Sequence, residues 1–230
     1  MIARVLLAAV IAGLLAGAVT SAIQLWRVTP LILAAETFET SDVTEEGAEA
    51  SADAAWMPAD GVERTANTVA ANMIMGVAFA FILAAVVMFS GRDITPANGV
   101  VWGLLGFITF TVAPTAGLAP ELPGMPAADL SARQAWWGGT VIATAGGIAL
   151  IALQGNMVLK ALGVVLIALP HLIGAPHPSS PESAVPAVLA AEFAARSIAS
   201  MAVFWIVLGV VFGWALTQSR IGAEARIDGN

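Results

Sequence analysis

Residues 78–89 read AFAFILAAVVMF, twelve residues with no charge and no strongly polar side chain. They belong to a longer uncharged stretch, 65–91. A helix needs about 20 apolar residues to cross a hydrocarbon layer of ~30 Å, and this stretch supplies them. A membrane-spanning β-strand would alternate polar and apolar residues, which this run does not do. The stretch therefore predicts a transmembrane α-helix, which satisfies its backbone polar groups internally.

Five further uncharged stretches divide the rest of the chain, at 5–26, 94–120, 134–159, 161–181 and 197–219. From all six we predict transmembrane helices near 5–26, 67–90, 98–118, 136–154, 157–174 and 197–217. The predicted fold is all-α, a polytopic integral membrane helical bundle in which residues 1–230 form a single transmembrane domain with short inner loops and longer outer loops. Only residues 154–156 separate the fourth helix from the fifth, which predicts an antiparallel hairpin. G-x-x-x-G pairs that permit close helix approach occur at Gly13/Gly17, Gly99/Gly103 and Gly209/Gly213.

The composition supports a membrane location and excludes several functions. Of 230 residues, 59% are hydrophobic and 11% charged, whereas soluble domains carry roughly 25% charged residues. The absence of cysteine excludes disulfides, iron–sulfur clusters and thiolate zinc sites. Net charge is −7 with basic residues scattered singly, so no nucleic-acid partner is expected. No P-loop, G-x-S-x-G or H-E-x-x-H motif occurs, and we predict that the chain is not an enzyme.

The first helix and the orientation are predicted from charges and aromatic residues. Arg4, an apolar run and small residues near 17–22 could also form a signal peptide. The run has full transmembrane length, however, and ends in the interface pair Trp26 and Arg27, so we predict a retained helix. Positive residues of the short predicted inner segments are Arg4, Arg92, Lys160, Arg220 and Arg226. Because such residues concentrate in the cytoplasm, both termini are predicted there.

Acidic residues gather on the predicted outer side, which receives 13 of the 16. Nine of them lie in an acidic outer loop, 36–63, whose field would raise the local concentration of cations. For 42–60 we favour a solvated, disordered segment. Glu36 and Glu39 follow an apolar run and would share one helix face, either as cation ligands or as a solvated helix end.

The second outer loop contains Pro114, Pro120, Pro123 and Pro126, which forbid a continuous helix. After it we predict a new helix, capped by Asp129 or Ser131. Arg133 would lie one turn further on, where it could pair with a carboxylate or stack on a tryptophan.

Both histidines, His171 and His177, lie in the predicted third outer loop. Their spacing of six excludes a helical i, i+4 ligand pair. Imidazole and carboxylate together suit divalent cobalt or nickel. The candidate metal ligands are therefore His171, His177, Glu121, Glu36 and Glu39, although a lone histidine is often structural. No charge lies at the middle of any predicted helix, which is a difficulty for an ion transporter.

The sequence resembles the CbtA family of predicted cobalt transporter subunits over essentially the whole chain. Three segments carry this resemblance. They are LILAAETFE at 31–39, APTAGLAPELPGMPAADLSARQAWW at 113–137 and LPHLIGAPHP at 169–178. The PELPG element with Pro123 and Gly124, the RQ-x-WW helix start and GAPHP are the most specific. Matching motif positions are Glu36, Glu39, Glu121, Arg133, Gln134, Trp136, Trp137, His171 and His177.

The resemblance implies cobalt uptake linked to cobalamin metabolism, through a multi-pass protein of the bacterial inner membrane. It implies a small single-span CbtB-like partner, with Co²⁺ as transported ion and no permanently bound cofactor. The bilayer is the other expected partner, and a homo-oligomer is left open. The alternatives are a non-transporting membrane scaffold or assembly protein, and an importer of nickel or another divalent cation.

Overall fold

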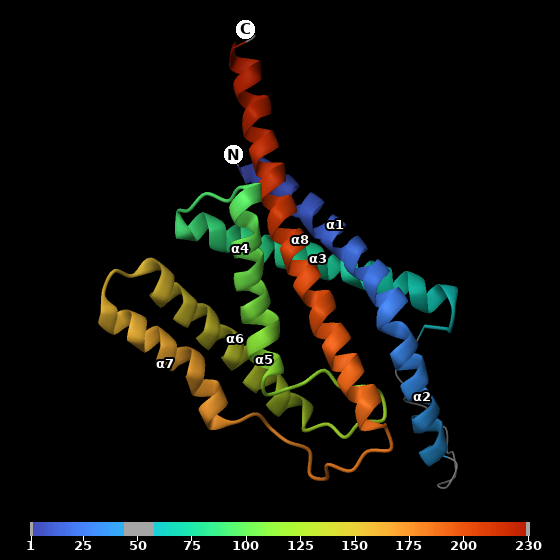
Figure 1. The fold of residues 1–230 in the computed structure, drawn as a ribbon. Coiled ribbons are helices and arrows are strands. Elements are labelled where there is room, and N and C mark those ends of the chain that lie inside the picture. The colour runs from blue at the N-terminus through green and yellow to red at the C-terminus, as the bar shows by residue number, and fades with distance from the viewer. Residues whose placement is uncertain (1, 44–57, 229–230) are drawn as a thin grey trace. The chain divides into compact units, whose positions relative to one another are not determined.

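The computed structural model describes residues 2–43 and 58–228, with side chains described for 2–38 and 58–219. The described chain consists of helices joined by loops and contains no strand (Figure 1). Its elements are α1 (Ile2–Arg27), α2 (Thr29–Val43), α3 (Val62–Ser90), α4 (Pro96–Phe107), the π-helix η1 (Ile108–Val112), α5 (Ala113–Thr115), α6 (Leu130–Leu153), α7 (Met157–Ile173) and α8 (Ala187–Asp228).

Five helices of the described chain are long and apolar enough to cross a membrane. They are Ile2–Arg27, Val62–Ser90, Pro96–Thr115, Leu130–Leu153 and Ala187–Ser219. The fifth predicted span forms α7, which is apolar but only 17 residues long. The prediction of an all-helical, polytopic membrane fold is confirmed.

The helices differ from the predicted spans mainly at their ends. α8 begins at Ala187, ten residues before the predicted start, because Glu192 and Arg196 form an i, i+4 ion pair that keeps both charges on the helix. The third span contains the π-helix η1 just before Pro114, which has no N–H for the carbonyl four residues back. Part of the predicted 36–63 loop is helical in α2, and residues 44–57 lie outside the described chain.

The chain divides into two compact units. Unit 1 comprises Met1–Ile23, Pro58–Phe107 and Ser200–Asn230, and unit 2 comprises Gln24–Met57 and Ile108–Ala199. That the chain forms one transmembrane domain stays a prediction.

Unit 1 is held by close backbone contacts at the glycines predicted from G-x-x-x-G spacing. A Cβ on Gly13 of α1 would lie 2.5 Å from the Cα of Val77 in α3. A Cβ on Gly103 of α4 would lie 2.2 Å from the carbonyl oxygen of Trp205 in α8. Neither position has room for a side chain, so these helices approach at backbone distance. Phe79, Phe204 and Trp205 fill the adjoining space with edge-on rings, their centroids 5.1–6.0 Å apart.

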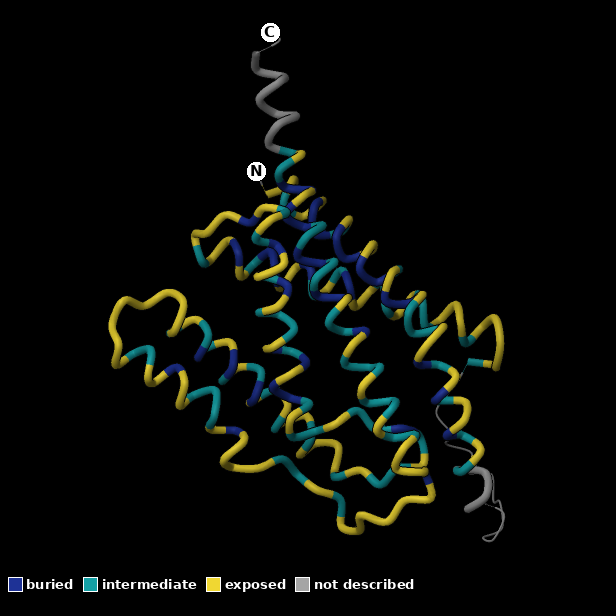
Figure 2. Tube along the Cα trace, viewed as in Figure 1, coloured by how far each residue is buried: buried dark blue, intermediate teal, exposed yellow. Residues whose placement is uncertain are grey.

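Unit 2 contains the predicted hairpin of α6 and α7, which lie side by side (Figure 1). Gln154–Asn156 form the turn, and the Asn156 side chain accepts a hydrogen bond from the Val158 amide to cap α7. A Cβ on Gly147 of α6 would lie 2.5 Å from the carbonyl oxygen of Gly163 in α7. Much of the remaining α7 surface is exposed and apolar, which suits lipid (Figure 2).

Candidate functional site

One end of unit 2 gathers the three segments that carry the family resemblance. We call this end the loop cluster, formed by residues 29–38, 113–137 and 169–193. Its small core consists of Ala35 from α2, Leu122 from the second loop and Val185 from the third, all less than 10% exposed. Partly buried side chains pack around them: Ile32, Phe38, Met125, Leu189 and Phe193. Residues far apart in the sequence are thus fixed together by apolar contacts.

An ion pair joins the second loop to the start of α6. The Arg133 guanidinium lies 2.7 Å from the Glu121 carboxylate, and their side chains are 30% and 25% exposed. The Nε of Arg133 is buried without a hydrogen-bond partner. Of the two partners predicted for Arg133, the structure selects the carboxylate.

Asp129 begins α6, as predicted. Its side chain accepts hydrogen bonds from the Ser131 hydroxyl and the Ala132 amide. The Ser131 hydroxyl, then the Ala132 amide, lowers the pKa of the Asp129 carboxyl below its usual 3.8. The charged cap fixes where α6 starts, and so where Arg133 and Trp136 lie.

Trp136 connects α6 to the end of α7. Its indole Nε1 donates a hydrogen bond to the carbonyl oxygen of Pro170, 3.2 Å away. Its ring also lies edge-on to His171, with centroids 5.9 Å apart. A Cβ on Gly117 would lie 2.4 Å from the Trp136 ring, so the second loop leaves room for this indole only because residue 117 is glycine. Trp136 therefore sets the position of His171.

The remaining motif residues occupy different places. Trp137 packs against Phe110 of η1, with ring centroids 6.3 Å apart, and Gln134 is exposed. Gly124 adopts a φ of +76°, which favours glycine in the PELPG turn, and Pro123 precedes it. These residues shape the loop cluster rather than filling one site.

The predicted metal ligands are brought to the same end but not into one group. His171 is exposed in the last turn of α7, and His177 is exposed in the loop that follows. Glu121 is paired with Arg133, and Glu36 is partly buried on α2. The side chain of Glu39 lies outside the described residues. Among the side chains that are described, no three from His, Asp and Glu are grouped to hold a metal. Metal binding by these residues stays a prediction.

Arg196 makes a contact between distant segments that sequence reasoning missed. It pairs with Glu192 and donates from Nη1 to the carbonyl oxygen of Arg27, 2.9 Å away, at the end of α1. The i, i+4 spacing of Glu192 and Arg196 is a readable signal. The contact with Arg27, 169 residues away, has no signature in the sequence.

The fold defines a class of protein: an all-helical, multi-pass membrane protein with an ordered loop cluster at one end of unit 2. A family model for the CbtA family, described as a probable cobalt transporter subunit, matches residues 2–217. The chain belongs to this family, as its sequence motifs predicted. Neither the curated proteins nor the solved structures give a match.

Proposed function

We propose that this chain is the membrane-embedded subunit of an importer for divalent cobalt. Support comes from membership of a family of cobalt transporter subunits over residues 2–217. One structural observation carries the proposal further. The three motif segments pack as a single loop cluster that carries His171, His177 and the Glu121–Arg133 pair. Imidazole nitrogen and carboxylate oxygen are ordinary ligands for first-row divalent metals.

The cation is proposed to arrive at the loop cluster from the periplasmic side. The acidic residues of 36–63 would raise its local concentration, and exposed His171 and His177 would contact it in turn. Each contact would be a single imidazole with water completing the coordination, weak enough for the ion to leave again. Glu121 would become a ligand of the cation only if the cation displaced the Arg133 guanidinium from the Glu121 carboxylate.

The proposal extends to the protein's setting. The chain would lie in the bacterial inner membrane with both termini in the cytoplasm and its first helix retained. A small single-span CbtB-like subunit would complete the importer, and the imported cobalt would serve cobalamin metabolism. No catalytic step is required of this chain.

Uptake of radiolabelled cobalt by cells without their own importers tests the proposal. The intact chain, with and without the small partner, is compared with an empty vector and with His177→Ala. His177 is the sharper choice because His171 also packs on Trp136, so its loss could disturb the fold. Removal of its imidazole should lower the rate of cobalt uptake, because the proposed contact depends on that ligand. The control is Ser179→Ala, a change two residues away in the same exposed loop.

The outcomes separate the alternatives. Cobalt uptake that falls in His177→Ala, but not in Ser179→Ala, supports both the importer and the histidine contact. Undiminished uptake in His177→Ala keeps the importer and removes His177 from it. Uptake that excess nickel abolishes more effectively than excess cobalt indicates a nickel importer. An absence of uptake despite normal membrane expression, with and without the partner, favours the scaffold.

A further inference from the structure

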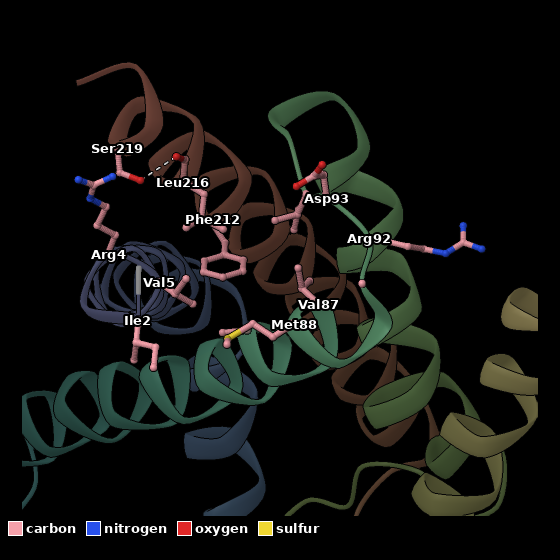
Figure 3. A pocket seen from close by; sticks show the side chains of 13 residues that line it. Ile2, Arg4, Val5, Val87, Met88, Arg92, Asp93, Phe212, Leu216 and Ser219 are labelled. Atoms are coloured by element: carbon pink, nitrogen blue, oxygen red, sulfur yellow. Dashed lines mark hydrogen bonds between the residues drawn. The ribbon is translucent and has the colours of Figure 1, made fainter. Parts of the chain in front are cut away.

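Unit 1 contains a cavity of about 350 Å³ between the start of α1, the end of α3, residues 212–219 of α8 and the 91–95 loop (Figure 3). Its volume lies at the lower end of the range for small-molecule sites, roughly 300–1,000 Å³. It contains none of the motif residues of the loop cluster, so the proposed cobalt function does not account for it. Its lining combines an apolar centre with charged residues at the edge.

The centre of the cavity is apolar. Figure 3 shows the Phe212 ring from α8 together with the side chains of Val5 and Met88, from α1 and α3, pointing toward one another. Phe212 is fully buried, and Val87 and Ala84 of α3 are less than 10% exposed. Val5 is partly exposed and Met88 is half-exposed, so a hydrocarbon chain that leaves water to contact them would gain free energy.

The edge of the cavity is basic. Arg4 and Arg92 line it, are exposed, and point outward on opposite sides (Figure 3). Asp93 is the acidic residue among the lining, so the two guanidinium groups outweigh it by one charge. Anionic headgroups are attracted to basic pockets of this kind between transmembrane helices.

The position of the cavity along the helices indicates its depth in the membrane. Three uncharged stretches end at its lining: 5–26 starts after Arg4, 65–91 ends before Arg92, and 197–219 ends at Ser219. The cavity therefore lies where the apolar helices leave the hydrocarbon and enter the headgroup region. A molecule at this depth meets both the apolar centre and the arginines.

We propose that this cavity binds one anionic phospholipid, with the start of an acyl chain against the accessible side chains of Val5 and Met88 and the phosphate beside one of the two arginines, Arg4 or Arg92. The apolar centre matches the chain, and the basic edge matches the phosphate. On the orientation proposed above, this is a lipid of the cytoplasmic leaflet. The lipid would contact the start of α1, the end of α3 and residues 212–219 of α8 together.

Lipid retention by the purified full-length chain tests this site. The chain in uncharged detergent is titrated with phosphatidylglycerol or with phosphatidylcholine of the same acyl chains, and bound lipid is counted by native mass spectrometry. A basic residue beside anionic lipid is ordinarily worth about a five-fold change in affinity, so Arg4→Gln with Arg92→Gln, which removes the arginine on either side, should lower phosphatidylglycerol binding about five-fold. Phosphatidylcholine binding should change little.

Two controls keep the result specific. Arg64→Gln removes an arginine at the opposite end of α3, outside the cavity, and should leave the preference intact. Ala84→Leu fills the apolar centre and should reduce binding of both lipids, whereas Ala78→Leu on the exposed face of α3 should not.

Three results would overturn the proposal: equal affinity for the two lipids, an unchanged preference in the double arginine variant, or unchanged binding in Ala84→Leu. Glycerol phosphate, a soluble headgroup without chains, should not displace the lipid at equal concentration. If it does, the site binds small anions instead. These readouts do not involve cobalt, so failure here and failure of the importer proposal are distinguishable.

Discussion

At the scale of single residues, the Glu121–Arg133 pair is a partly buried ionic contact of the loop cluster. Exposed ion pairs contribute about 1 kcal/mol or less, whereas breaking a buried pair costs roughly 3–5 kcal/mol. With side chains 30% and 25% exposed, this pair lies between these limits. Arg133→Gln should therefore lower the free energy of unfolding by about 1–3 kcal/mol, measured by denaturant titration in detergent micelles.

The chain offers a matched control for this substitution. Arg64 pairs with Asp60 at 3.1 Å, but the Asp60 side chain is 89% exposed. Arg64→Gln should cost less than about 1 kcal/mol. Glu121→Gln combined with Arg133→Gln should cost less than the sum of the single changes, since both remove one interaction. Additive losses would show that the pair does not stabilise the cluster.

The cap of α6 predicts a dependence of stability on pH. Because folding lowers the pKa of Asp129 below 3.8, the charged cap stabilises the folded state above this pH. That stability is lost as pH falls through the lower, folded pKa. Asp129→Asn keeps a capping side chain but no charge. Its deficit against the unaltered chain should be present near about pH 6 and should shrink as the pH falls below 3.8 and through the lower, folded pKa. Unfolding midpoints across this range test it, and a constant deficit would contradict it.

At the scale of elements, close backbone contact decides which glycines of α6 are replaceable. Gly147 meets the carbonyl of Gly163, whereas a Cβ on Gly139 would meet nothing within 4 Å. Gly147→Ala should destabilise the hairpin by about 1–3 kcal/mol, the usual cost of overpacking. Gly139→Ala should be neutral or stabilise α6 by up to about 1 kcal/mol through helix propensity. Thermal unfolding of both variants provides the comparison, and equal effects would mean that α6 and α7 do not pack at Gly147.

The positions of the helices could be predicted from the uncharged stretches of the sequence. Charged side chains are unfavourable in hydrocarbon, and the hydrocarbon layer has a fixed thickness, so each crossing needs an uncharged stretch of about the same length. The prediction failed where charges are neutralised on the helix itself, as by Glu192 and Arg196 at the start of α8. The Asp129 cap was predictable because capping is local. The contact of Trp136 with Pro170 and His171 was not, since it depends on the register of α6 against α7. The motifs therefore located the loop cluster, but not which of its side chains touch.

At the scale of the whole molecule, the number of membrane crossings depends on α7. At 1.5 Å per residue its 17 residues span about 26 Å, slightly less than the hydrocarbon layer of ~30 Å. α7 nevertheless runs back along α6: Gly163 lies against Gly147, and Pro170 accepts a hydrogen bond from Trp136, two turns into α6. If α6 crosses the membrane, the end of α7 must return to the side from which α6 started.

We therefore expect six crossings, with both termini on one side. Reporter fusions at Gly155, in the α6–α7 turn, and at Ser180, after α7, should report opposite sides of the membrane. A fusion at Gly91, between α3 and α4, should agree with Gly155, because α4 to α5 and then α6 cross between them. If Gly155 and Ser180 report the same side, α7 does not cross, the termini lie on opposite sides, and His177 faces the cytoplasm. Cobalt would then meet the histidines only after crossing, and the proposed order of contacts would have to be reversed.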